Sequence, residues 1–266
     1  MKGTLQDLLQ GIQARRAILL EGYNDYELHQ LRVSVRRLRG LLRFEDSPAA
    51  WHLRREWGYL IGHTNPCRDW DTLAERIESM PTEEQPVTLV DAMNEHRASI
   101  WKKVRVTLAA PAWDEALQRS EHHLTHRVGP ADHPPADADA IQEASRRLRR
   151  AWKRVQEQDN NRAWHKLRIA VKDLRYNLDS SGEERYHDAI KLCRLLQEQL
   201  GNWHDGIVHG ELLDNLDREL GDHEIAARRA IHSLRGLMQR EGKRCLEDVR
   251  GIMEGRGHTL APKKLA

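Results

Sequence analysis

The sequence predicts an all-α protein, built from two helical bundles that arise from an internal duplication. Charged residues make up 32% of the 266 residues and aromatic residues only 5%. This composition favours helices, because strands need runs of β-branched and aromatic residues. Apolar residues recur at intervals of three and four, and no segment alternates like a strand. A basic helical motif occurs twice, 136 residues apart, which predicts the duplication.

The periodicity divides each half of the chain into successive helices. In the first half we expect helices over 3–21, 26–45, 49–62, 67–79, 86–109 and 113–127, and in the second over 139–158, 161–179, 184–200, 203–220 and 223–253. Asn24 precedes Glu27 by three residues, which predicts a capping box at the start of the second helix. Asn160 or Asn161 is expected to cap the helix over 161–179.

Helix breakers mark the predicted boundary between the halves. They are concentrated in the linker 128–138, which separates half-repeat 1 (1–127) from half-repeat 2 (139–255) within one domain over 1–255. Residues 256–266 are expected to form a flexible tail. The repeat predicts a pseudo-twofold relation between the bundles, around a basic central groove or pore.

The repeated motif places cations on one side of a helix. Residues 29–39 are HQLRVSVRRLR and residues 165–175 are HKLRIAVKDLR, and Asp69 matches Asp205 at the same offset. At about 100° per residue, the cations fall within an arc of about 80° in each copy, with leucine and valine opposite. These stripe residues are His29, Arg32, Arg36, Arg39 and Arg43 in the first copy, and His165, Arg168, Lys172 and Arg175 in the second.

The stripes predict a polyanion-binding site. Residues 29–43 hold five arginines and no acid, so this helix offers them no ion-pair partner. The motif spans about 15 Å at the helical rise, which suits a linear run of anionic groups better than one phosphate. Arginine offers forked donors to phosphate oxygens, whereas lysine offers a point charge. The alternative is a solvated face, or one that acids of other helices neutralise.

The overall composition constrains the partners and the compartment. The net charge is only +2, so the protein is no general coating for nucleic acid. Its positive charge is instead clustered locally, within residues 32–43. The three cysteines form no CxxC pair, which is typical of reduced thiols in the cytosol. The first 21 residues lack the apolar core of a signal peptide, and no stretch approaches 18 apolar residues. We therefore expect a cytoplasmic protein that makes no membrane contact.

Histidines raise three competing chemistries. His122 and His126 lie four residues apart beside His123, but no zincin-type glutamate lies between them, so we expect no metal site. His204-Asp205 resembles a metal phosphohydrolase pair, yet Arg68 stands in place of the histidine in the first half. We expect the shared aspartate to cap a helix or to anchor a stripe cation. A histidine phosphotransfer protein is the third alternative, although the His-x-x-Lys-Gly pattern is absent.

Nucleic acid is the main rival ligand, because any polyanion releases counterions on binding. The tryptophans have spacings that favour helix packing, and none lies on a stripe. These are Trp51, Trp57, Trp101, Trp113 and Trp152. A second basic run, residues 146–154, either extends the anion surface or is solvated. A general nucleic-acid-binding module therefore stays open as an alternative.

The paired motifs resemble those of the CHAD family, the conserved histidine α-helical domain. The resemblance rests on the two His-x-x-Arg helices, on the RDWD sequence at 68–71 and on LGNWHD at 200–205, and it spans residues 5–253. It implies two pseudo-twofold-related bundles with a basic pore, binding of inorganic polyphosphate and association with polyphosphate granules. The implied site is His29, Arg32, Arg36, Arg39, His165, Arg168, Lys172 and Arg175, whereas Arg43 follows from stripe geometry alone.

No Glu-x-Glu-x-Lys segment of the triphosphate-processing domains found in some family members occurs here. We therefore expect a stand-alone, non-catalytic receptor or granule-associated scaffold for polyphosphate, without cofactor, metal or catalytic residue.

Overall fold

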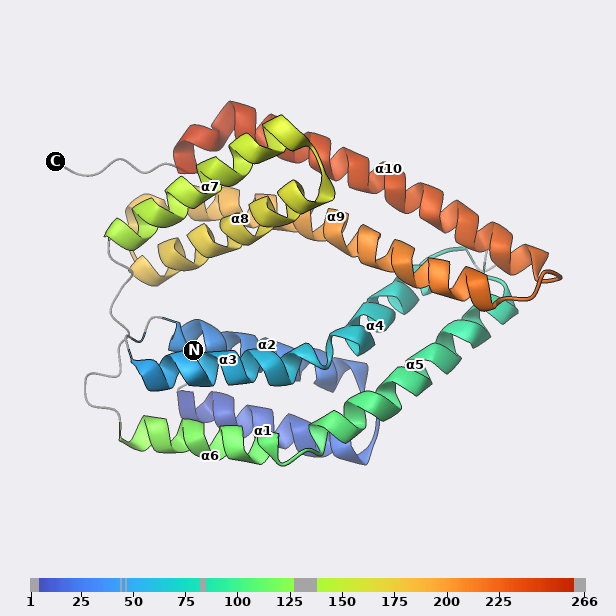
Figure 1. The fold of residues 1–266 in the computed structure, drawn as a ribbon, viewed down its shortest axis with the longest axis horizontal. Coiled ribbons are helices and arrows are strands. Elements are labelled where there is room, and N and C mark those ends of the chain that lie inside the picture. The colour runs from blue at the N-terminus through green and yellow to red at the C-terminus, as the bar shows by residue number, and fades with distance from the viewer. Residues whose placement is uncertain (1–4, 44, 46, 82–84, 127–137, 261–266) are drawn as a thin grey trace. The chain divides into compact units, whose positions relative to one another are not determined.

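The computed structural model describes residues 5–43, 45, 47–81, 85–126 and 138–260. Within these ranges all regular structure is helical, which confirms the predicted all-α class (Figure 1). The chain forms two compact units. Unit 1 comprises Met1–His133 and Asn215–Ala230, and unit 2 comprises Pro134–Asp214 and Ile231–Ala266.

Unit 1 is a helical bundle whose core contains the apolar face of the first motif helix. Its helices are α1 (Leu5–Glu21), α2 (Asp25–Leu42), α3 (Pro48–Gly62), α4 (Asn65–Glu78), α5 (Val87–Leu108) and α6 (Ala112–Thr125). In α2 the predicted apolar residues Leu28, Leu31, Val35, Leu38 and Leu42 are all buried. They pack with Trp57 and Trp113, whose rings meet edge to face with centroids 5.7 Å apart.

Unit 2 is built around the second motif helix. It contains α7 (Ala138–Gln158), α8 (Asn161–Ser181), the 3₁₀ turns η2 (Glu184–Tyr186) and η3 (Gly257–Leu260), and most of α9 (His187–Glu219) and α10 (Ile225–Arg256). The predicted apolar face of α8 is buried throughout, at Leu167, Val171, Leu174 and Leu178. Trp164 and Trp203 join the same core.

Side-chain caps fix the start of both motif helices. The Asn24 carboxamide accepts a hydrogen bond from the Glu27 backbone at 2.9 Å, as predicted. Glu27 does not complete the capping box, because its carboxylate binds Arg15 at 2.6 Å. Asn160 caps α8 by accepting from the Ala163 backbone at 3.0 Å.

Several predicted boundaries differ from the structure. The break expected at residues 201–202 is wrong: α9 is one continuous helix. Its neighbours Leu200 and Trp203 are both buried, so packing on either side holds residues 201–202 in the helix. The helix expected over 26–45 ends at Leu42. Residues 215–230, expected in the second half-repeat, group with unit 1.

The expected linker 128–138 falls outside the described residues, except for residue 138 at the start of α7. The expected tail is ordered in its described part, because α10 continues to Arg256 and η3 buries Leu260. The duplication and the pseudo-twofold relation stay predictions.

Candidate functional site

The α2 stripe flanks the buried face of the helix, about 100° around the axis from it, rather than lying opposite. His29, Arg32, Arg39 and Arg43 are half-buried, and Arg36 is exposed. Each cation follows the buried leucine or valine before it by one residue, so core packing sets the direction of the stripe. Arg43 is the residue that follows the last turn of α2.

Hydrogen bonds to α3 and to the residues that follow it hold two stripe arginines in place. Arg32 donates from one terminal nitrogen to the Thr64 hydroxyl at 2.6 Å. Burial and the positive charge of Arg36 lower the pKa of Arg32 to about 10, while Asp69 opposes this shift. Arg39 donates from Nε to the Arg54 carbonyl at 3.1 Å, and its guanidinium lies across Gly58. The backbone at Gly58 leaves room for it, because an added Cβ would lie 2.9 Å from the Arg39 nitrogen.

His29 marks the centre of a cationic cluster in unit 1. Burial lowers its pKa, followed by the positive charges of Arg68, Arg36 and Arg32. Arg68 comes from α4 and also pairs with Glu75 at 2.9 Å. Arg68 belongs to the repeated motif, but the stripe geometry of α2 did not place it at the site. Its alignment with the histidine of the second copy was the signal that should have included it.

Arg36 is the most available cation of the cluster. Its Nε donates to the Arg32 carbonyl at 3.3 Å, and no carboxylate of the described residues pairs with it. An exposed guanidinium with only a backbone partner keeps its forked donors for an external anion.

The α8 stripe has the same relation to the core of unit 2. His165, Arg168, Lys172 and Arg175 are half-buried and flank the buried face formed by Leu167, Val171 and Leu174. The Arg168 Nε is buried and has no hydrogen-bond partner among the described residues. Such an orphaned donor costs free energy unless a ligand satisfies it.

The last cation of this stripe is partly neutralised. Arg175 pairs with Asp179 at 3.0 Å and lies 4.8 Å from the centroid of the Tyr176 ring. Asp173, the acid off the stripe, pairs instead with Arg147 of α7 at 3.4 Å.

His204 of α9 joins the second cluster. Its ring centroid lies 5.3 Å from that of His165. Burial lowers the pKa of His204, followed by the positive charges of Arg168 and His165. His204 and Arg68 are 136 residues apart, so the residue next to the stripe histidine is cationic or titratable in both units.

The two aspartates of the motif lie inside helices. Asp69 is in α4 and Asp205 in α9, so the expectation that they cap helices is wrong. The negative charge of Asp69 instead favours the charged form of Arg32, which agrees with the alternative of an anchor for a stripe cation.

Two other candidate sites are the histidine cluster of α6 and the basic run of α7. The His122 and His126 rings stack with centroids 4.0 Å apart, but in the described part of the chain no three His, Cys, Asp or Glu side chains could hold a metal ion. In the basic run 146–154, Glu143 pairs with three arginines of α7: Arg146, Arg147 and Arg150. That face is therefore partly compensated within its own helix.

The tryptophan prediction is right for the core residues and wrong for one. Trp57 and Trp113 are fully buried, and Trp101 and Trp152 are partly buried. Trp51 is 45% exposed on α3.

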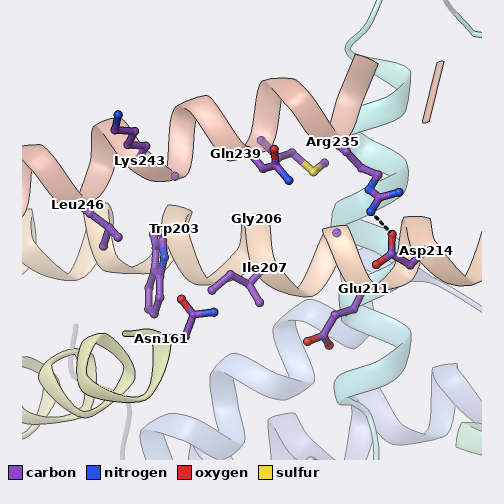
Figure 2. A pocket seen from close by; sticks show the side chains of 13 residues that line it. Asn161, Trp203, Gly206, Ile207, Glu211, Asp214, Arg235, Gln239, Lys243 and Leu246 are labelled. Atoms are coloured by element: carbon purple, nitrogen blue, oxygen red, sulfur yellow. Dashed lines mark ion pairs between the residues drawn. The ribbon is translucent and has the colours of Figure 1, made fainter. Parts of the chain in front are cut away.

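A hollow of about 440 Å³ lies between α9 and α10 in unit 2 (Figure 2). Trp203, Ile207, Met238 and Leu246 give it an apolar wall, and Asp214 pairs with Arg235 at 2.7 Å on its border. No stripe residue lines it. The hollow is therefore separate from the α8 stripe.

The model of the CHAD domain family matches residues 3–214 of this chain. The chain belongs to the CHAD domain family. Its fold is similar to the crystal structure of the CHAD domain from the plant Ricinus communis, with a TM-score of 0.70 and 24% sequence identity, covering 98% of this chain and 90% of that one. It is also similar to PptA from Streptomyces chartreusis, with a TM-score of 0.69 and 13% identity, covering 95% and 97% of the two chains. No curated protein matches the sequence.

At these sequence identities, both similarities show the fold of this CHAD domain. Within its described residues, no helix is both long enough and apolar enough to cross a bilayer.

Proposed function

We propose that this CHAD domain binds inorganic polyphosphate through the stripes of α2 and α8, as a non-catalytic receptor or granule-associated scaffold in the cytoplasm. The observation that carries the proposal is the presence, in each unit, of a cation cluster with too few acids. Arg36 has no carboxylate partner and the Arg168 Nε has no partner at all among the described residues.

The electrostatics of the clusters support an anionic ligand. Burial, followed by the positive charges around them, lowers the pKa of His29 and of His204, so neighbouring cations oppose a further proton in both clusters. A phosphate chain would relieve that repulsion and offer acceptors to several guanidinium groups at once. Such contacts recognise the charge and the spacing of phosphate groups, and they do not require bases.

The proposal of a non-catalytic role is supported by the residue types of the stripes. The stripe side chains are cations and histidines, and Ser34, the nearest hydroxyl of α2, donates to the Gln30 carbonyl at 3.0 Å. Arginine and lysine hold a polyanion but supply neither a nucleophile nor a water-activating carboxylate, and the phosphate-release assay below tests whether the stripe histidines act as a nucleophile. The expected readout is therefore stable binding without release of orthophosphate.

The experiment is calorimetric titration with long-chain polyphosphate at physiological salt, alongside an orthophosphate-release assay. The double variant Arg36→Glu/Arg168→Glu should lose binding while its helical circular dichroism is retained. Arg37→Glu/Arg162→Glu is the matched control, because both arginines are exposed, lie on the same two helices and leave the stripes untouched. Equal loss in both variants would mean diffuse charge attraction, and phosphate release by the wild type would contradict the non-catalytic role.

The sequence predicts further that the two stripes serve one polyanion chain. In that case each single reversal weakens one common binding event and the stoichiometry stays constant. If the stripes act separately, a single reversal instead removes one class of sites and leaves the other unchanged.

A further inference from the structure

A row of aromatic and cationic side chains lies on the exposed face of α3, outside the stripes. Trp51, Arg55, Tyr59 and His63 follow one another at intervals of four residues, and we name them the α3 ridge. At about 100° per residue they share an arc of about 120°. Trp51 is 45% exposed and Tyr59 is 70% exposed. Large rings that remain in solvent on a helix with a buried opposite face point to a recognition surface.

The ridge side chains are arranged as a stacking surface. The Arg55 guanidinium carbon lies 4.7 Å from the centroid of the Trp51 ring, within cation–π distance. The Tyr59 and His63 rings meet edge to face, with their centroids 4.6 Å apart. Among the described residues no carboxylate pairs with Arg55, so its charge is not neutralised.

The charge of this face selects the class of ligand. The one acid in the sequence of α3 is Glu56, and its carboxylate binds Arg119 of α6. The ridge thus combines π-faces with unpaired positive charge and has no acid of its own. Single-stranded nucleic acid needs this combination, because bases stack on aromatic rings while cations follow the phosphates.

Geometry allows more than one base to be held. Trp51 and Tyr59 are eight residues apart, or about 12 Å at the helical rise, which leaves room for two bases of one strand, separated by an intervening nucleotide, on separate rings. Arg39 of the α2 stripe borders the ridge, because it donates to the Arg54 carbonyl and lies across Gly58 of α3. A phosphate between the two bases would therefore lie near both Arg55 and Arg39.

We infer that the α3 ridge binds single-stranded nucleic acid by stacking bases on Trp51 and Tyr59, with Arg55 and Arg39 on the phosphates. This activity is additional to polyphosphate binding and uses the bases, which polyphosphate lacks. A partner protein is the other occupant that such a surface fits, since Trp, Tyr and Arg dominate protein–protein hot spots. A surface of that kind would bind strands with and without bases equally well.

The test compares two fluorescent single strands by anisotropy at physiological salt. One is oligothymidylate of about 12 nucleotides, a typical site size for such surfaces, and the other is an abasic strand of the same length and charge. The wild type should bind oligothymidylate at least about fivefold more tightly. Trp51→Ala/Tyr59→Ala should remove this preference, and Trp51→Phe/Tyr59→Phe should retain most of it.

Tyr26→Ala is the matched control, because Tyr26 is 62% exposed in unit 1 but lies on α2, outside the ridge. It should keep the wild-type preference. Equal binding of both strands by the wild type, or an undiminished preference in the double alanine variant, would overturn the inference. Polyphosphate titration of that variant should match the wild type, so failure of the ridge and failure of the stripes are told apart.

Discussion

Replacing Arg168 by methionine should weaken polyphosphate binding and stabilise the fold. The Arg168 Nε is buried without a hydrogen-bond partner among the described residues, in a unit whose cation cluster also includes Lys172 and His204. Methionine keeps the packing of the alkyl chain but removes the charge and the unsatisfied donor. If the orphaned donor exists to meet a phosphate, stability and affinity must change in opposite directions.

The magnitudes follow from the burial of this side chain. An unsatisfied buried donor costs about 1–3 kcal/mol, and the half-buried position of Arg168 favours the lower end. A gain of about 1 kcal/mol raises Tm by about 2–4 °C in a protein of this size. Loss of charge-assisted hydrogen bonds worth about 1.5–3 kcal/mol weakens binding by roughly 10- to 150-fold.

The assay pairs differential scanning calorimetry in phosphate-free buffer with titration by long-chain polyphosphate. Arg162→Met is the control, because Arg162 is exposed on the same helix. Its Tm and affinity should stay near those of the wild type, as surface substitutions usually do. A lower Tm together with unchanged affinity for Arg168→Met would contradict a phosphate-binding role, since Arg168 would then be a structural residue.

Three further predictions concern pH and stability. Burial and then neighbouring cations lower the pKa of His29, and a bound polyanion should raise it, so that His29 takes up a proton on binding. The gain in affinity is complete below the pKa of the free protein and is lost as pH rises through the pKa of the complex. Affinity measured calorimetrically should thus increase from about pH 7.5 to 5.5, and His29→Gln should reduce both this increase and the proton uptake. Asn160→Ala should lower the free energy of unfolding in urea by about 1 kcal/mol through loss of the α8 cap, whereas an unchanged midpoint would show that core packing alone sets this helix start. Asp71→Asn should cost about 2 kcal/mol in the same assay, because it leaves the partly exposed Arg97 without the charge it pairs with at 3.1 Å; Asp91→Asn, an exposed site on α5, is its control.

The sequence predicted the parts of the fold that local physics determines. The apolar faces of α2 and α8 are buried at every predicted position, and Asn24 and Asn160 cap their helices. Periodicity and capping act within a few residues, so they can be followed along the chain. The break at residues 201–202 was wrong because burial of Leu200 and Trp203, a tertiary effect, holds the helix through Gly201.

The site was predictable to a similar degree. Helical periodicity gathered the cations of α2 and α8 on one side of each helix, but it did not reveal which of them find partners. Arg39 is fixed by the Arg54 carbonyl, and a terminal nitrogen of Arg175 by Asp179, whereas the Nε atoms of Arg168 and Arg175 find no partner in the described chain. Such pairing depends on neighbouring helices and turns. The prediction for Trp51 was wrong because Trp51 and Trp57, six residues apart, lie about 120° apart around a helix and so do not share one face.

The most direct test of the central claim is an NMR titration that follows the arginine side-chain Nε–Hε resonances as polyphosphate is added. Arg36 and Arg168 should shift together with the binding isotherm, because phosphate oxygens meet the terminal nitrogens of Arg36 and the unpaired Nε of Arg168. Arg37 and Arg162, exposed on the same helices, should shift little. Shifts spread evenly over exposed arginines, with Arg168 unaffected, would contradict polyphosphate binding by the stripes.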